Sequence, residues 1–597
     1  MAKKPDDSTP EHESPSPSEQ THITKRSRRT FLGTASAISV AGALTTKIPL
    51  AKAQTRPGGD GRNARDRFND EAQRRHALKV RVDTAWSDYQ PPVGQHPVNG
   101  DEDLYPNHIG SDTRGLPHDD RGEVDPAAWA LAAKAFASRD PADWDKIPLG
   151  GTRKLVNPLG TLAVNYVGYD ATQITIPPAP TLAGAQRASE AVELYWQAIL
   201  RDVPFGQYAT HPLVAEAVAE LDKLPAYTGP KVNGHVTPDT LFRGSVTYAD
   251  PKDASGRTAK HVTPLGVLDG PYISQFLLRD IPYGVTYAPG KYRLPSAVLE
   301  NDFATTHDEW LKVQNGVTSG RSIKFDSTLR YLNTGRDLAE YVHGGASSFI
   351  GAALLLAGAV SKDPTWPGGI GAPLSPTNPY VKSPNQAGGN GSFASGYFQG
   401  QVTLAQSLAI RIEYWQKWFV HRVLRPEAFG GLLNQHLVNG ASYPLHKDIL
   451  DSKALAYSYR KHGSYLLPQA FPEGAPNHSS YPGGNASTSG VSVTLLKAFF
   501  DESFVIPNPV QVDPSDPTKL IPYVGPPLTV GGELNKIALN SGLGRNWAGI
   551  HWRTDAAAAF AAGEEIAIGI LRDERRALKE PFAGFTFTKF DGTKITI

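Results

Sequence analysis

Apolar side chains recur every three or four residues along much of this sequence, and this spacing restricts its fold more than any other feature. Such a period gathers the apolar residues on one face of an α-helix. The alternation of apolar and polar residues that is typical of half-buried strands is scarce. The sequence therefore predicts a mainly α fold, with helices over residues 127–138, 181–200, 211–224, 336–360, 401–424, 489–502 and 554–578.

Two further patterns refine this prediction. The C-terminal stretch GFTFTKFDGTKITI alternates in character and contains Asp591-Gly592, a pair that favours tight turns, so we expect a short β-hairpin there. The apolar run 349–360 is too short to cross a bilayer and indicates a buried core helix. We therefore expect helices joined by long loops, and no membrane span in the mature protein.

The N-terminus has the features of an export signal. Residues 1–24 are polar and rich in Pro, Ser and Glu, which predicts a loose tail. Next, Arg28 and Arg29 precede a short apolar run, 31–44, and an A-x-A cleavage signal at 51–53. This arrangement resembles a twin-arginine export peptide. We expect residues 1–53 to be tail and signal, the mature protein to be periplasmic or secreted, and one large helical domain to occupy 65–597.

Charge and sulfur content exclude several classes of function. The chain has 60 basic and 59 acidic residues, a net charge of +1, so no overall field points to nucleic acid. It contains no Cys, and its only Met is the first residue, which excludes disulfides and thiolate metal sites. Because Cys and Met are the most easily oxidised side chains, their absence suits a protein that works beside peroxide or hypohalous acid. Compositional drift would explain the absence as well.

The first of three chemistry-bearing segments is KWFVHRVLRP. Lys417 and Arg425 are eight residues apart in it, close to two helical turns or a rise of about 12 Å. We expect Pro426 to end this helix. Both cations would then leave one broad helix face and could converge on a single anion. Taken alone, the pair is explained better by a solvated basic face.

The other two segments are NHSSYPGGNAST and GRNWAGIHW. In the first, Gly483 and Gly484 precede a Ser/Thr-rich helix start, where free N–H groups and the helix dipole favour an anion. The second contributes Arg545 and His551. Each segment alone would fit an ordinary structural role, but the three together predict one oxyanion site in the last third of the chain.

In this order, the pieces K-x7-R-P, P-G-G-N and G-R-x5-H resemble the pattern shared by vanadium-dependent haloperoxidases and the related phosphatidic acid phosphatase superfamily. The seven-residue gap is similar to that of the algal and cyanobacterial bromoperoxidases. Segments such as YPNHIGSDTRGLPHDDRGEVDP and WQKWFVHRVLRPEAFGG extend the likeness over nearly the whole mature chain. The resemblance implies two four-helix bundles, with the active-site bundle in about 400–597, and subunits that form dimers or larger homo-oligomers.

The resemblance also implies vanadate as the cofactor, with His551 as the ligand of the metal. Hydrogen peroxide, a halide and an organic acceptor would be the reactants, and bromide would be oxidised to hypobromous acid while the metal acts as a Lewis acid. Lys417, His478 and Asn485 would take part in catalysis. The metal ligand, cationic side chains and N–H donors together would hold the cofactor: His551, Lys417, Arg425, Arg545, Gly483 and Gly484.

Two positions depart from the family pattern P-S-G-H. Gly483 replaces Ser, which deletes a hydrogen bond to the oxyanion of about 1.5–3 kcal/mol. Asn485 replaces the His that is thought to act as acid–base group, and an amide cannot titrate. Since positioned proton transfer contributes about 10²- to 10⁴-fold in rate, we expect cofactor binding with impaired peroxide activation, unless His478 takes the proton.

Two alternatives remain open at this point. In an acid phosphatase of the same superfamily, His551 would be the nucleophile and the residue at 485 would protonate the leaving group. In a non-catalytic relative, the cage of Lys417, Arg425 and Arg545 would bind vanadate or phosphate without turnover.

Overall fold

The computed structural model describes residues 70–597, apart from 251, 254, 345–347, 364–365 and 389–390. The predicted tail and signal, 1–53, lie outside the described residues. Glu71–Ile597 form one compact unit. Its helices, in chain order, are α1 (Asp70–Tyr89), α2 (Asp101–Leu104), α3 (Pro126–Ser138), α4 (Pro141–Trp144), α5 (Ala185–Leu200), α6 (Pro212–Leu221), α7 (Gln275–Leu278), α8 (His307–Gln314), α9 (Gly335–His343), α10 (Ser348–Ala357), α11 (Ser395–Gln416), α12 (Pro426–Asn439), α13 (Lys447–Leu450), α14 (Lys453–His462), α15 (Gly484–Phe499), α16 (Val530–Trp547) and α17 (Arg553–Ala577).

The strands in the described part of the chain are short and pair only as antiparallel hairpins. The predicted C-terminal hairpin is present, with Phe587 opposite Ile595. The other pairs carry too little alternation to be predicted from sequence. The pairs are β1 (Val246–Ala249) with β2 (Ala259–Val262), β3 (Ile281–Tyr283) with β4 (Thr286–Ala288), β5 (Val510–Asp513) with β6 (Asp516–Pro522), and β7 (Thr586–Thr588) with β8 (Lys594–Thr596).

The mainly α class is confirmed, but the predicted helices differ from the structure in several places. The single helix predicted over 336–360 is wrong, because α9 ends at His343 with Gly344 as its C-cap and α10 begins at Ser348. In addition, the sequence did not predict α1, α8, α12, α14 or α16. The absence of a signal for α16 has a structural reason. Nearly all of its residues are buried, so it has no polar face and its sequence lacks an amphipathic period.

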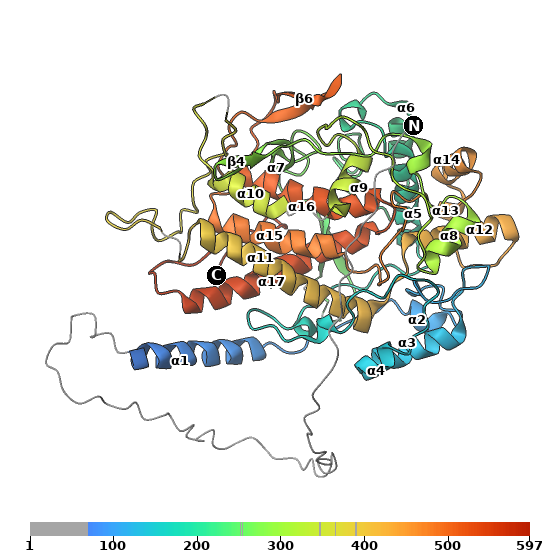
Figure 1. Ribbon diagram of the computed structural model, residues 1–597, viewed down its shortest axis with the longest axis horizontal. Coiled ribbons are helices and arrows are strands. Elements are labelled where there is room, and N and C mark those ends of the chain that lie inside the picture. The colour runs from blue at the N-terminus through green and yellow to red at the C-terminus, as the bar shows by residue number, and fades with distance from the viewer. Residues whose placement is uncertain (1–69, 251, 254, 345–347, 364–365, 389–390) are drawn as a thin grey trace, which may run out of the picture. The chain divides into compact units, whose positions relative to one another are not determined.

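Four long helices from the C-terminal third pack into one bundle (Figure 1). In it α15 contacts α11, α16 and α17. A second helical group is built on α5, which packs against α6, α13 and α14 and also touches α16. The N-terminus of α15 and the C-terminus of α16 are the parts of the bundle that carry candidate site residues.

Facing glycines let α15 and α17 approach closely. A Cβ at Gly490 would lie 2.4 Å from the backbone oxygen of Phe560, and one at Gly563 would lie 2.3 Å from that of Ser487. Real side chains do not tolerate such distances, so only glycine permits this backbone-to-backbone packing. The contact fixes the start of α15 relative to α17.

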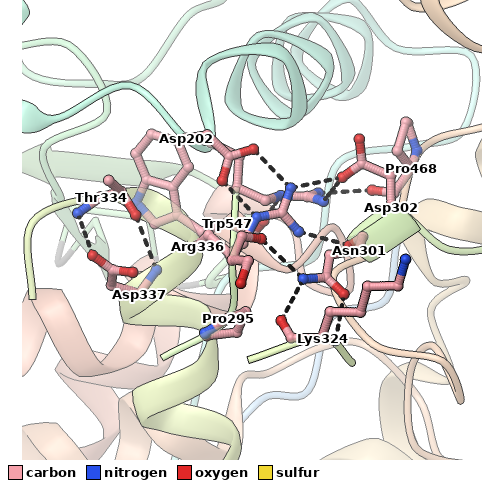
Figure 2. Close-up of polar contacts among 12 residues, drawn as sticks. Asp202, Pro295, Asn301, Asp302, Lys324, Thr334, Arg336, Asp337, Pro468 and Trp547 are labelled. Atoms are coloured by element: carbon pink, nitrogen blue, oxygen red, sulfur yellow. Dashed lines mark hydrogen bonds and ion pairs between the residues drawn. The ribbon is translucent and has the colours of Figure 1, made fainter. Parts of the chain in front are cut away.

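Buried ion pairs anchor the C-terminal end of α16 (Figure 2). Arg201 donates from Nε to the carbonyl oxygen of Trp547 at 2.9 Å and from Nη1 to Asp302 Oδ1 at 3.0 Å. Arg336 pairs with Asp202 and, at 2.9 Å, with Asp302. Although burial works against ionisation, Arg201 and Arg336 hold the pKa of Asp302 below its ordinary value. The network therefore holds the last turn of α16 against α5 and α9.

Candidate active site

A cavity of about 380 Å³ lies at the N-terminal end of α15. It brings together five of the residues singled out in the sequence: His478, Gly484, Asn485, Arg545 and His551. Both polar and apolar side chains complete the wall: Val342, Phe349, Gln406, Ile410, Tyr414, Pro476, Thr488, Ser489 and Ser541.

The first turn of α15 presents unpaired N–H groups at this cavity. Gly483 is the N-cap, and its own N–H donates to the carbonyl oxygen of Asp555 at 2.8 Å. Within the described part of the chain, the N–H groups of Gly484 and Asn485 have no acceptor. A Cβ at Gly484 would lie 2.9 Å from Glu413 Oε2, which explains the glycine. Two free donors at the positive end of a 16-residue helix suit an oxyanion.

His551 is held as a neutral ring with one nitrogen free of hydrogen. Its Nδ1 donates to Asp555 Oδ2 at 2.7 Å, and its Nε2 lies 3.0 Å from Arg425 Nη1. Burial and the positive charge of Arg425 lower the pKa of His551 well below its usual value. Because a guanidinium can only donate, Nε2 carries the lone pair. A carboxylate-bound imidazole whose other nitrogen carries a lone pair is the form that binds a metal, and here that lone pair accepts a hydrogen bond from Arg425.

Arg425 connects this ring to the rest of the site. It is the N-cap of α12, with Pro426 as the first residue of that helix. The prediction that Pro426 ends a helix is therefore wrong. Proline fits the first turn of a helix because that turn needs no N–H donor there. The Arg425 side chain is 1% exposed and donates to backbone oxygens of His478 (3.0 Å) and Ile550 (2.9 Å).

Lys417 approaches from a different element. It begins a π-helical turn, Lys417–His421, after α11, and Arg422 then adopts a left-handed conformation (φ 38°). The two cations therefore do not share one helix face, which corrects the prediction from their eight-residue spacing. The Lys417 ammonium group is 0% exposed and donates to the carbonyl oxygens of Ser479 (2.9 Å) and Ser480 (2.8 Å).

A buried carboxylate accompanies Lys417. Glu413 Oε1 lies 3.3 Å from the ammonium nitrogen, and Oε2 accepts from Ser487 at 2.9 Å. Burial lowers the pKa of Lys417 to about 8, although the carboxylate of Glu413 opposes the change. Lys417 and Arg425 thus supply positive charge from behind the cavity wall.

Arg545 and Asn485 form the polar wall on the α16 side. Arg545 lies in the last turn of α16 and donates from Nε to Asn485 Oδ1 at 3.2 Å. Its guanidinium also lies over the ring of Phe471, 5.8 Å from the centroid. Burial, with the nearby charge of Arg425, lowers the pKa of Arg545 to about 10. Arg545 is therefore charged at neutral pH and faces the cavity.

His478 has partners at both ring nitrogens. Its Nδ1 lies 3.1 Å from Arg425 Nη2, and its Nε2 lies 3.2 Å from the hydroxyl of Tyr414. Burial and the charges of Lys417 and Arg425 lower the pKa of His478 well below 6.5. His478 is therefore a neutral ring that lines the cavity.

Three neighbours of the site were not predicted from sequence. Asp555 follows His551 by four residues, and Glu413 precedes Lys417 by four, so the i, i+4 spacing of opposite polar groups could have identified both. Tyr414 carried no such signal. Its role depends on the π-helical turn and on the position of His478, which only the folded chain defines.

This chain is similar to known proteins over most of its length. A family model described as the VCPO second helical-bundle domain matches residues 411–580. The chain is 32% identical to a vanadium-dependent bromoperoxidase from Ascophyllum nodosum over 505 residues, which cover 81% of this chain and 86% of that relative. This chain belongs to the vanadium-dependent haloperoxidase family.

Two further relatives extend the likeness along the chain. A vanadium-dependent bromoperoxidase from Corallina officinalis is 32% identical, over 84% of this chain and 92% of the relative. The homohexameric structure of the second vanadate-dependent bromoperoxidase (AnII) from Ascophyllum nodosum matches with a TM-score of 0.78 at 29% identity. That match covers 91% of this chain and 94% of the other.

The structure also explains why glycine fits at one of the two departures from the haloperoxidase pattern. A Cβ at Gly483 would lie 3.1 Å from the carbonyl oxygen of Asp555. A serine there would need the start of α17 to move by a few tenths of an ångström. At the other departure, the amide oxygen of Asn485 accepts a hydrogen bond from Arg545. A titratable side chain at this position would also have Arg545 as its neighbour.

No helix in the described part of the chain is long and apolar enough to cross a membrane.

Proposed function

We propose that this haloperoxidase family member is a vanadate-dependent bromide peroxidase with reduced turnover. The proposal draws on relatives that are named vanadium-dependent bromoperoxidases and on a cavity that suits an oxyanion. One observation carries it: His551, oriented by Asp555, offers an unprotonated Nε2 beside a helix N-terminus with free N–H groups. Hydrogen peroxide, bromide and an organic acceptor are the proposed reactants.

The residues present fit vanadate. His551 would bind the metal, the N–H groups of Gly484 and Asn485 would donate to its oxygens, and Arg545 would neutralise charge from the cavity wall. Lys417 and Arg425 would add positive charge from behind that wall. When bound, vanadate supplies a Lewis acid that activates hydrogen peroxide toward bromide.

Asn485 is the residue that we expect to reduce turnover. Its amide can orient a ligand and hold Arg545, but it cannot exchange a proton near neutral pH. His478, which we expected to serve instead, has Arg425 at one ring nitrogen and Tyr414 at the other. Loss of positioned proton transfer corresponds to about 10²- to 10⁴-fold in rate.

Asn485→His tests this role. We expect it to raise the rate of bromination of a phenolic dye, measured with orthovanadate, peroxide and bromide, by about 10²-fold or more. Asn485→Gln is the matched control, because it keeps the amide group and only lengthens the side chain by one methylene group. If both variants leave the rate unchanged, the role assigned to Asn485 is wrong.

A non-catalytic oxyanion-binding protein is the second candidate, favoured by the absence of a free titratable nitrogen at His478. Calorimetric binding of orthovanadate, with no bromination by the wild type or by Asn485→His, would select it. The two candidates share the same anion site and differ only in turnover.

We also propose that the protein is exported by the twin-arginine route to the periplasm or medium, and that it assembles as a homo-oligomer. The first proposal depends on the sequence of residues 1–53, and the second on the homohexameric relative. Cell fractionation tests the first. Sedimentation velocity tests the second, with a monomer as the contradicting result.

A further inference from the structure

Arg425 sets the position of a proton on each of two histidines. Its Nη1 lies 3.0 Å from His551 Nε2, and its Nη2 lies 3.1 Å from His478 Nδ1. A guanidinium has only N–H donors, so each of these histidine nitrogens must accept. For His551 this agrees with the donation of its Nδ1 to Asp555.

The ring proton of His478 lies on Nε2 for the same reason. The carbonyl oxygen of Ser479 also lies 3.0 Å from His478 Nδ1 and could accept from it. A hydrogen on Nδ1 would, however, point at an amino group of Arg425, which is a donor and cannot accept it, so Nδ1 accepts from Arg425. The neutral ring therefore donates from Nε2 to the hydroxyl oxygen of Tyr414, 3.2 Å away.

This leaves the hydroxyl hydrogen of Tyr414 without an acceptor. Within the described residues, His478 is the only hydrogen-bond partner of that hydroxyl group, and Tyr414 lines the cavity. Burial raises the pKa of Tyr414, so the phenol keeps its hydrogen across the physiological range. Tyr414 is half-buried and lines the cavity, so its hydroxyl hydrogen is available to an acceptor that enters the cavity.

We propose that Tyr414 is an anion-binding residue, whose phenol donates a hydrogen bond to the oxyanion in the cavity, and that Arg425 and His478 are positioning residues that fix this direction. The inference rests on the proposed function for its anion. It gives His478 a role in orientation instead of proton transfer. It also adds a neutral donor to a site in which Gly483 has removed a hydroxyl group.

Calorimetric binding of orthovanadate to the cofactor-free full chain tests the proposal, with phosphate as a second probe. Tyr414→Phe should weaken binding of both by about tenfold or more, since a hydrogen bond to a charged group is lost. Tyr397→Phe is the matched control: it removes the hydroxyl of another tyrosine of α11, which bonds Glu574. Unchanged affinity in Tyr414→Phe would overturn the proposal.

A second measurement addresses the direction of the hydrogen bonds in the wild type and uses one variant only to assign the signals. ¹⁵N NMR of the histidine-labelled wild type, with His478 assigned by His478→Gln, should show Nε2 protonated and Nδ1 bare. A proton on Nδ1 would contradict the proposed direction of the hydrogen bonds from Arg425 to His478 and from His478 to Tyr414.

The outcomes separate this inference from the proposed function. A wild type that binds orthovanadate through Tyr414 without brominating would refute the function alone. Bromination by the wild type with Tyr414→Phe binding equally well would refute the inference alone.

Discussion

Asp555 is the residue whose replacement tests the site geometry most sharply. Its Oδ2 accepts hydrogen bonds from His551 Nδ1 at 2.7 Å, from the N–H of Trp552 at 2.9 Å and from the hydroxyl of Ser480. The carboxylate is 0% exposed, so water cannot replace these bonds. Asp555→Ala would therefore leave three buried donors without an acceptor, and His551 without the partner that sets its tautomer.

The magnitude follows from these contacts. Each unsatisfied buried donor costs about 1–3 kcal/mol, and removing one member of a buried charged network costs about 3–5 kcal/mol in total. We expect Asp555→Ala to lower the free energy of unfolding by about 3–5 kcal/mol. Removal of a group that orients a metal-binding histidine typically lowers metal affinity by about 10- to 100-fold, and we expect the upper end of that range here.

Asp555→Asn is the informative comparison. The hydrogen bonds all converge on Oδ2, whereas Oδ1 has no partner among the described residues. An asparagine can place its carbonyl oxygen at the Oδ2 position and its amide nitrogen at the Oδ1 position, so the bonds survive, while the charge is lost and the amide N–H groups lie where Oδ1 has no partner. We expect its orthovanadate affinity to fall by about tenfold or less.

Denaturant unfolding and orthovanadate calorimetry on both variants provide the assay. The reasoning is refuted if Asp555→Asn loses as much affinity as Asp555→Ala, because the tautomer of His551 would then not depend on an acceptor at Oδ2. It is also refuted if Asp555→Ala binds orthovanadate as the wild type does.

Three other predictions concern packing, pH and export. Gly563→Ala should lower the free energy of unfolding by about 1–3 kcal/mol in denaturant unfolding, because its Cβ would lie 2.3 Å from a carbonyl oxygen of α15. A Cβ at Gly400 would have no neighbour within 4 Å, so Gly400→Ala should raise the free energy of unfolding slightly. Burial lowers the pKa of His343, but Glu340 and Glu473 raise it to about 9, so its contribution to stability is complete below pH 6.5 and is lost as pH rises through about 9. Relative to His343→Gln, the wild type should therefore lose about 1–2 kcal/mol between those pH values in pH-dependent unfolding. Replacing both arginines of the export signal by lysine should retain the precursor in the cytoplasm on cell fractionation, and export at the wild-type rate would contradict the twin-arginine assignment.

Sequence periodicity was sufficient for helices whose apolar side chains recur every three or four residues, whether or not the opposite face is exposed. The predicted ranges 181–200 and 554–578 correspond to α5 and α17, and the C-terminal hairpin was found because Asp591-Gly592 fixes its turn. The periodicity of apolar residues did not reveal α16, which is buried on all sides and shows no polar face. A helix whose polar and apolar residues are distributed around its whole circumference, as in α16, gives no periodic signal.

For the site, residue types were easier to predict than geometry. The sequence identified Arg425, Arg545 and His551, and the fold brings them into one region. The straight-helix argument for Lys417 and Arg425 failed because a π-helical turn and a left-handed residue intervene. Hydrogen-bond direction at the two histidines could not be predicted, since it depends on where one guanidinium points after folding.

The vanadium content of the purified full chain after reconstitution with orthovanadate and removal of excess is the most direct test of the central claim. The account predicts stoichiometric vanadium in the wild type and its loss in His551→Ala, with Arg545 and Lys417 left unchanged. A wild type that retains no vanadium, or a His551→Ala variant that retains as much as the wild type, would contradict it.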